Sequence, residues 1–273
     1  MSAGGEKLIV GAVAYHPRIV SIWEAFIPYF EAAGVPTDYV LYSNYDRQVE
    51  ALLEGEIDIG WNTNTAYVVA EERLGGEAQV LGMRDVDADY RTLIVTRSNE
   101  QLDVPGSLAG KRLALGSRDS GHAAILPLHY LAREGLDAAR ECELVRFDTD
   151  LGKHGDTGDS ELRVLRAVQE GVADAGALGD ATWALLRVQS PETTAGLEAR
   201  WTSPTYYHCN FTALPSFDRE LAERWSAALL AMSYDDPSMR PAMDLEGVKR
   251  WLPGDKSGYV DLTEAMREQA RVE

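Results

Sequence analysis

The stretch LALGSRDSGHAAILPLHYLAREG, residues 113–135, reads as a short apolar strand, a glycine–serine turn and a helix. At such a helix start, free backbone N–H groups and the positive end of the helix dipole converge, and together they favour an anion. The turn also carries Arg118 and Asp119. The stretch therefore predicts an α/β unit whose turn meets a ligand, with a carboxylate among its polar groups.

Strands and helices alternate on both sides of this stretch. The other predicted strands lie at residues 7–15, 37–43, 57–63, 142–148 and 173–180. The predicted helices that follow or separate them lie at residues 16–34, 46–56, 66–76, 121–135 and 159–172. Strands that alternate with helices favour a parallel sheet with crossover helices, so the fold class is α/β.

The pattern occurs twice, which predicts two lobes rather than one sheet. A helix followed by Gly-x-x-Asp appears in LLEGEIDIGW (52–61) and again in VQEGVADAGAL (168–178). RTLIVTRS (91–98) is predicted to cross from one lobe to the other, and WTSPTYYHCNFTALPS (201–216) to be the return strand. The predicted boundaries are residues 1–91 and 213–273 for lobe 1, with a helical tail packed on it, and residues 92–212 for lobe 2, with the crossing strands.

Composition excludes several classes of partner. The 273 residues carry a formal net charge of −18, which argues against nucleic acid, since phosphate backbones are bound by surplus Lys and Arg. No apolar run reaches the roughly 18 to 20 residues of a membrane span. The first residues, MSAGGEKLIVGAVAY, contain no basic region followed by an apolar run. We therefore expect a cytoplasmic protein, or a periplasmic or extracellular one if the sequence is a trimmed mature form.

Three segments resemble the phosphonate/phosphite-type solute-binding proteins of ABC transporters. They are YDRQVEALLEGEIDIGWNTNTAYVVA (45–70), GSRDSGHAAILPLHYLAREGL (116–136) and RVLRAVQEGVADAGALGDATW (163–183). The resemblance runs from about Leu8 to about Met232. It implies a two-lobed type II periplasmic-binding-protein fold with a ligand cleft between the lobes, a small anionic or polar organic ligand of the phosphonate or carboxylate class, and an ABC transporter permease as a partner.

The same fold is similar to that of intracellular enzymes such as 4,5-dihydroxyphthalate decarboxylase and the dehydratases of menaquinone biosynthesis. The alternative function is therefore a cytoplasmic lyase that acts on a small carboxylate. Its acid/base groups would be Asp119, His122, His154 and His208. No cofactor and no metal-ligand set are predicted, although an enzyme of this kind could use one divalent metal.

The predicted ligand-binding residues occupy positions that match the family's cleft or lie beside them. They are Tyr15, His16, Tyr45, Asn62, Thr63, Asn64, Ser117, Arg118, Ser120, Gly121, His154 and Asp180. Their location agrees with the rule that ligands bind beyond the carboxyl ends of strands in open α/β sheets. Asn62 or Thr63 is also expected to cap the helix that follows, because short polar side chains are favoured there.

Two details stay open at this level. Asp119 either turns outward as a helix cap or points into the cleft, where its charge repels a dianion unless Arg118 compensates. We therefore expect phosphate and simple alkylphosphonates to bind weakly, and an organic ligand with one anionic group and a second polar or ring portion to bind better. A His208–Cys209 nucleophile pair is disfavoured, because adjacent residues of a strand face apart. His129, in the middle of a helix between apolar neighbours, is interpreted as structural.

Overall fold

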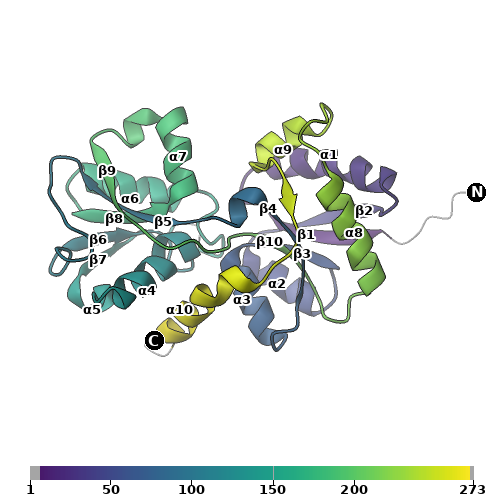
Figure 1. Ribbon diagram of the computed structural model, residues 1–273, viewed down its shortest axis with the longest axis horizontal. Coiled ribbons are helices and arrows are strands. Elements are labelled where there is room, and N and C mark those ends of the chain that lie inside the picture. Colours follow the sequence, from purple (N-terminus) through teal and green to yellow (C-terminus); the bar gives the residue numbers. More distant parts are fainter. Residues whose placement is uncertain (1–6, 150, 271–273) are drawn as a thin grey trace, which may run out of the picture. The chain divides into compact units, whose positions relative to one another are not determined.

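The computed structural model describes residues 7–149 and 151–270. They form two α/β units, each built around its own sheet (Figure 1). Unit 1 contains the chain up to Asp89 together with Tyr207–Tyr259, and unit 2 contains Tyr90–Tyr206 and the chain from Val260 onward. The two-unit α/β organisation predicted from the sequence is confirmed.

The sheet of unit 1 is mixed. Its strands lie in the order β11 (Trp251–Leu252), β4 (Gln79–Arg84), β10 (Asn210–Ala213), β3 (Ile59–Asn62), β1 (Leu8–Val13) and β2 (Thr37–Tyr42). β1 is parallel to β2 and β3, whereas β10 is antiparallel to β3 and β4. The helices of this unit are α1 (Arg18–Ala32), α2 (Tyr45–Leu53), α3 (Asn64–Arg73), α8 (Arg219–Ala231) and α9 (Arg240–Glu246).

The sheet of unit 2 repeats this plan. Its order is β7 (Glu143–Arg146), β6 (Arg112–Leu115), β8 (Ala175–Gly179), β5 (Thr92–Arg97) and β9 (Leu197–Thr202). β6 is parallel to β7 and β8, and β5 is antiparallel to β8 and β9. The helices are α4 (Leu126–Arg133), which continues a π-helical turn η2 (Gly121–Ile125), α5 (Ala138–Glu141), α6 (Asp159–Gln169), α7 (Asp180–Gln189) and α10 (Val260–Ala270). Short 3₁₀ turns are η1 (Asp85–Asp87), η3 (Pro191–Thr193) and η4 (Ser257–Tyr259).

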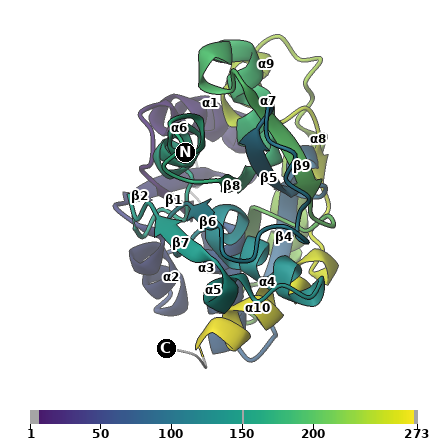
Figure 2. The ribbon, with the colours of Figure 1, turned by 90° about the vertical axis from the view of Figure 1, so that its left-hand side faces the viewer.

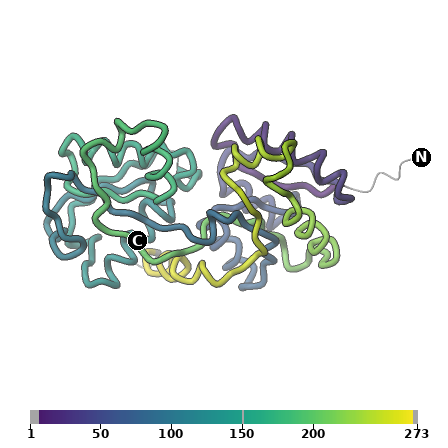
Figure 3. The backbone as a smooth tube through the Cα atoms, turned by 45° about the horizontal axis from the view of Figure 1, so that its top comes forward, coloured from purple at the N-terminus to yellow at the C-terminus, as the bar shows by residue number. Residues whose placement is uncertain are grey.

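The chain passes between the units in three places, which the tube in Figure 3 follows by colour. Before β5 and before β10 the two connecting segments run antiparallel. Tyr90 and Tyr206 exchange backbone hydrogen bonds of 3.2 and 3.0 Å in unit 2, and the His208 N–H donates to the Asp87 carbonyl at 2.9 Å in unit 1. Each connecting segment therefore leads into an antiparallel strand, β5 in the sheet of unit 2 and β10 in the sheet of unit 1.

Two expectations about the second half of the chain need correction. Residues 201–216 do not form one return strand: β9 ends at Thr202 and β10 begins at Asn210. Pro204 stands between them, and proline lacks the N–H that a central strand must donate. The strand β9, which begins at Leu197, was not predicted.

The helical tail does not stay with the first unit. α9 packs on α1 in unit 1, but α10 packs on α4 in unit 2, where Figure 2 shows the two helices together. Leu262 and Ala265 of α10 are fully buried, and the Gln269 side chain donates to the Ile125 carbonyl at 3.1 Å. These contacts lie about 130 residues apart in the chain, and no local pattern reports them.

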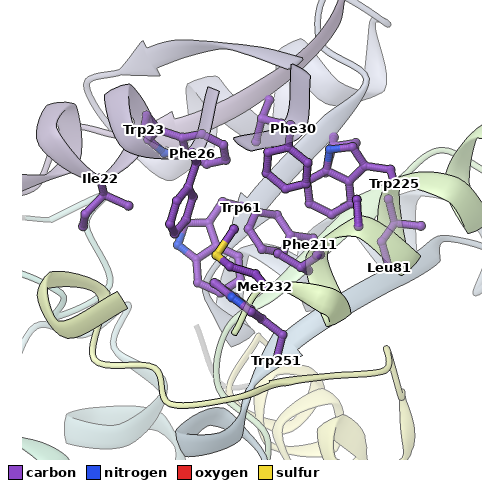
Figure 4. Close-up of a cluster of buried hydrophobic side chains, with 14 of the residues drawn as sticks. Ile22, Trp23, Phe26, Phe30, Trp61, Leu81, Phe211, Trp225, Met232 and Trp251 are labelled. Atoms are coloured by element: carbon purple, nitrogen blue, oxygen red, sulfur yellow. The ribbon is translucent and has the colours of Figure 1, made fainter. Parts of the chain in front are cut away.

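The core of unit 1 is aromatic (Figure 4). The Phe211 ring of β10 lies 4.1 Å from the Trp61 ring of β3 and 4.9 Å from the Trp225 ring of α8, measured between centroids. The Trp225 ring in turn stacks on Phe30 of α1 at 5.0 Å. The Phe211 side chain of β10 thus joins the sheet to the helices that cover it.

We predict that Phe211→Ala destabilises the protein by about 3–5 kcal/mol, because it removes a buried ring that neighbouring side chains cannot fill. Urea denaturation followed by circular dichroism measures this loss. Val188→Ala, at a side chain that is 83% exposed, is the control and should change stability by less than about 0.5 kcal/mol. A loss of stability no larger than that of the control would contradict the prediction.

Candidate functional site

The helix start at Gly121 owes its shape to Pro127. Proline has no N–H, so the carbonyls of His122 and Ala123 lack the donor that residue 127 would supply in a π- or α-helix. The Ala123 carbonyl accepts instead from the Gly116 N–H at 3.0 Å, and the His122 carbonyl from the Thr92 hydroxyl at 2.8 Å. A Cβ on Gly116 would stand 2.7 Å from that of Ala123, so only glycine allows this approach.

Ser120 caps this helix. Its hydroxyl oxygen accepts from the Ala123 N–H at 3.2 Å, and its carbonyl accepts from Ala124 and Ile125. Ser117, the other serine predicted to bind ligand, donates its hydroxyl to the Thr149 carbonyl. The helix start therefore presents the first-turn N–H groups of Gly121 and His122, which have no acceptor within the helix itself.

The charged residues of the turn hold a loop. The Arg118 side chain donates to Asp148, at 3.0 Å from its Nε, and is 60% exposed. Asp119 accepts from the Gly152 N–H at 2.5 Å. Asp119 is thus not the helix cap expected as one alternative, because Ser120 takes that role, and Arg118 is engaged by Asp148. The two side chains thus fasten Asp148 and Gly152 to the turn.

The fastened loop carries His154 in a left-handed backbone conformation, with φ of +54° and only 5% of the residue exposed. A non-glycine residue rarely adopts this conformation, and such strain concentrates at functional sites. Gly155 follows with φ of +89°, and a Cβ there would lie 2.7 Å from the Ser120 hydroxyl and 3.1 Å from the His122 ring. The loop backbone therefore lies directly against the helix start.

His122 is buried beside Glu161 of α6, with 3.6 Å between Nε2 and Oε2. Glu161 also accepts from the Gly179 N–H and from the Thr182 hydroxyl, each at 2.7 Å. Burial alone would lower the pKa of His122, but the Glu161 carboxylate outweighs it and raises that pKa above its ordinary value. Burial would likewise raise the pKa of Glu161, but His122 and the two donors hold it below its ordinary value. The two groups form a buried ion pair.

Asp180 completes this part of unit 2. It is the first residue of α7, and its Oδ1 accepts from the Arg91 N–H at 3.2 Å. Asp156 and Asp180 also contribute to the raised pKa of His122. The Tyr90 ring lies 5.7 Å from the His122 ring. Within unit 2 the structure therefore gathers predicted residues from three separate segments around the helix start.

We predict that the His122–Glu161 pair stabilises unit 2 most between pH 4.5 and 6.5, the ordinary pKa values of the two groups. The pKa of His122 is raised, so its contribution is lost as the pH rises through the raised value; that of Glu161 is lowered, so its contribution is lost as the pH falls. A double-mutant cycle with His122→Gln and Glu161→Gln, run in urea within this range and at pH values below and above it, measures the coupling, which should be largest within the range.

Each single substitution leaves the partner charge buried and should cost about 3–5 kcal/mol within that window. A coupling free energy that does not change with pH would show that the two side chains are not an ion pair.

In unit 1, the NTNT turn follows β3 as expected. Thr63 caps α3, because its hydroxyl oxygen accepts from the Ala66 N–H at 3.2 Å. Asn62 is buried and accepts from the Gln48 amide at 2.7 Å, and Asn64 accepts from the Thr65 N–H at 2.8 Å. The turn is thus structurally engaged, as the capping interpretation anticipated, and its role in binding stays a prediction.

Two of the other predicted residues of unit 1, Tyr15 and Tyr45, belong to one hydrophobic cluster, with Tyr15 packed against it. Tyr15 and the exposed His16 stand between β1 and α1, where Arg18 places its guanidinium 5.6 Å from the Tyr15 ring centroid. Tyr45 is buried in a cluster with Val13, Val49, Ala66 and Ala70. Arg18 was not predicted; its position at the start of a helix after a strand is the signal that could have indicated it.

His208 differs from its expectation. It precedes β10 rather than lying in it, so strand alternation does not apply, and its Nδ1 stands 3.0 Å from the Cys209 sulfur. Its neighbour Asp87, 3.6 Å away, is engaged by Arg84 through bonds of 2.7 and 2.8 Å. The expectation that His208 and Cys209 face apart was therefore wrong.

Glu161 was also missed, because a glutamate in the first turn of a helix normally faces solvent and is read as a favourable dipole charge. Only its burial identifies it. The prediction that the residues of the two units share one pocket stays a prediction.

These features define a two-lobed solute-binding protein of the type II periplasmic-binding-protein fold. The chain matches the family described as "ABC transporter, phosphonate, periplasmic substrate-binding protein" over residues 11–259, and it belongs to this family. Membership implies a small-molecule ligand and a transporter permease as partner.

Individual relatives agree. The chain is 22% identical over 248 residues to the probable ABC transporter phosphite binding protein PhnD1 of Prochlorococcus marinus (strain MIT 9301). This match covers 87% of the chain and 80% of the relative. The structure of PhnD1 in complex with methylphosphonate is similar, with a TM-score of 0.74, 20% identity and coverage of 97% and 98%. XAC2383 from Xanthomonas citri bound to ATP gives a TM-score of 0.76, 20% identity and coverage of 98% and 100%.

The comparisons correct two expectations. The family is periplasmic, so the cytoplasmic location is not supported and the periplasmic alternative is favoured. The decarboxylase or dehydratase alternative also finds no support among them. No helix within residues 7–149 and 151–270 is long and apolar enough to cross a bilayer.

Proposed function

We propose that this chain captures a small phosphorus oxyanion, of the phosphonate or phosphite class, outside the cytoplasmic membrane and delivers it to the permease of an ABC transporter. The oxyanion binds in unit 2 at the start of the helix that begins at Gly121. The main support for this location is that the strained His154–Gly155 backbone packs against Ser120 and His122 at that helix start.

The helix start supports an anionic ligand for two reasons. Its first-turn N–H groups point along the positive end of the helix dipole, and η2 continues into α4 as one helical segment. His122 adds an imidazole whose pKa is raised above its ordinary value by the nearby carboxylates, which favours its protonated form. Ser120 keeps its hydroxyl proton available as a donor, because it caps the helix with an oxygen lone pair.

The carboxylates near His122 support a phosphorus rather than a sulfur oxyanion. Asp156 and Asp180 both act on the pKa of His122, so negative charge surrounds the pair. A phosphonate or phosphite that keeps one proton can donate it to a carboxylate, whereas a sulfonate has no proton to donate. The expectation of weak alkylphosphonate binding rests on an Asp119 that faces the ligand; we propose instead that it faces the loop, where it accepts from the Gly152 N–H. We further propose that binding needs no metal or cofactor.

We predict that the full chain binds methylphosphonate and phosphite, and that methanesulfonate binds at least about tenfold more weakly, the ratio that 1.4 kcal/mol represents. The physical reason is that a sulfonate carries no proton to donate to the carboxylates around His122. Isothermal titration calorimetry in EDTA measures the three affinities. Acetate is included as a carboxylate probe. Tight binding of acetate or methanesulfonate without binding of either phosphorus oxyanion would refute the proposal.

We predict that Gly155→Ala weakens methylphosphonate binding by about tenfold or more, because the added Cβ would press on Ser120 and His122. Gly158→Ala is the matched control: this glycine also has a positive φ, +75°, but nothing lies within 4 Å of its Cβ position. Both variants carry the same kind of backbone strain, so calorimetry on the pair isolates the contact. Equal affinities in the two variants would place the ligand elsewhere.

A further inference from the structure

The contact between α4 and α10 in unit 2 contains a buried histidine surrounded by carboxylates. His129 of α4 is 5% exposed, and its Nδ1 lies 3.0 Å from Oε2 of Glu268. Its other nitrogen, Nε2, is buried and has no hydrogen-bond partner within residues 7–149 and 151–270. A buried imidazole nitrogen without a partner loses its hydrogen bonds to water and gains none in the protein, which costs free energy. It therefore indicates a missing ligand.

Two further carboxylates belong to the same group. One oxygen each of Asp261 and Glu264 and one nitrogen of the His129 ring lie within 4.8 Å of one another. Asp261 and Glu264 are three residues apart on α10, so they share a face of that helix. Two ligand atoms about 2.1 Å from one ion stand at most about 4.2 Å apart, so side-chain shifts of under about 1 Å bring the set to coordination distance.

We propose that His129, Asp261 and Glu264 bind one divalent transition metal ion of the zinc class. The ion takes Nε2 of His129 and one oxygen of each carboxylate, and Glu268 accepts the proton on Nδ1. A carboxylate on the second ring nitrogen is the usual arrangement of a metal-bound histidine, because it fixes the tautomer and raises the basicity of the ligand nitrogen. The site would fasten α10 to α4.

The donor set selects the metal. Imidazole with carboxylates suits zinc, copper and nickel, whereas magnesium and calcium prefer oxygen ligands alone. Three protein ligands leave a coordination position for water. Asp261 already accepts from the Tyr130 hydroxyl at 2.9 Å and from Arg133 at 2.8 Å. The Arg133 side chain is 58% exposed and can turn into solvent, so its positive charge does not prevent a cation from binding at Asp261.

A second group in unit 1, formed by Asp87, His208 and Cys209, is also compact but is a poorer candidate. Asp87 receives two short hydrogen bonds from the buried Arg84 guanidinium. A metal ion beside that fixed charge would be repelled in a medium of low dielectric constant. Zinc bound by the first group would depend on Glu264, whereas zinc bound by the second group would depend on Cys209. The titration described below therefore distinguishes the two groups.

The test is calorimetric titration of the untagged, EDTA-treated full chain with ZnCl₂, and separately with MgCl₂. We expect one zinc ion per chain, a higher melting temperature with zinc, and little heat with magnesium. His129→Gln and Glu264→Gln should each weaken zinc binding by about tenfold or more, and Glu268→Gln should weaken it by a similar factor through the ring. Glu264 is exposed, so its variant keeps the fold if the buried His129 variant does not.

Cys209→Ser and Glu220→Gln, the latter an exposed glutamate of α8, are the controls and should bind zinc as the parent chain does. The proposal is overturned if the parent chain binds no zinc, if Glu264→Gln binds it unchanged, or if Cys209→Ser abolishes binding. It does not rest on the proposed function, because methylphosphonate affinity is measured in EDTA and zinc affinity without ligand.

Discussion

The missing N–H of Pro127 is the constraint on which the helix start of unit 2 depends. Two carbonyls that a regular helix would use internally are left to outside donors, the Gly116 amide of the turn and the Thr92 hydroxyl of β5. The turn after β6 and the inserted strand are therefore tied to the same first turn. The backbone proposed to meet an anion is held by hydrogen bonds from both sides, and such an arrangement requires little rearrangement on binding.

Charge at this place is balanced locally rather than by the protein as a whole. The chain carries a net charge of −18, yet the buried His122, whose pKa is raised by Glu161, lies 3.6 Å from that carboxylate beside the helix start. Burying both charges is costly, and it is tolerated because Glu161 receives two further hydrogen bonds. Arg118 and Asp148 pair beside the helix start, and Asp119 accepts from the Gly152 N–H. An acidic protein can thereby present a locally favourable site for an anion.

The two units use different means to hold an inserted strand. In unit 1, β10 carries Phe211 into an aromatic core formed with Trp61 and Trp225. In unit 2, β5 packs aliphatic side chains against those of β8 and α6, and its Thr92 hydroxyl bonds to the helix start. The hydrogen bond from Thr92 thus joins β5 to the helix start in unit 2, the unit that also carries the strained His154 loop. In unit 2, β5 therefore belongs both to the sheet and to the candidate site.

The sequence by itself determined the α/β alternation, the two units, the helix start at Gly121 and the family, because local periodicity and turn residues act over a few positions. It also indicated His154, whose glycine-rich loop is visible in the chain. The burial of Glu161, the partner of Arg118 and the placement of α10 on α4 depended on contacts between residues 21 to 139 positions apart. Such contacts depend on which faces of helices and strands pack together. The sequence pattern shows which face of an element is apolar, but it does not show which other element that face packs against.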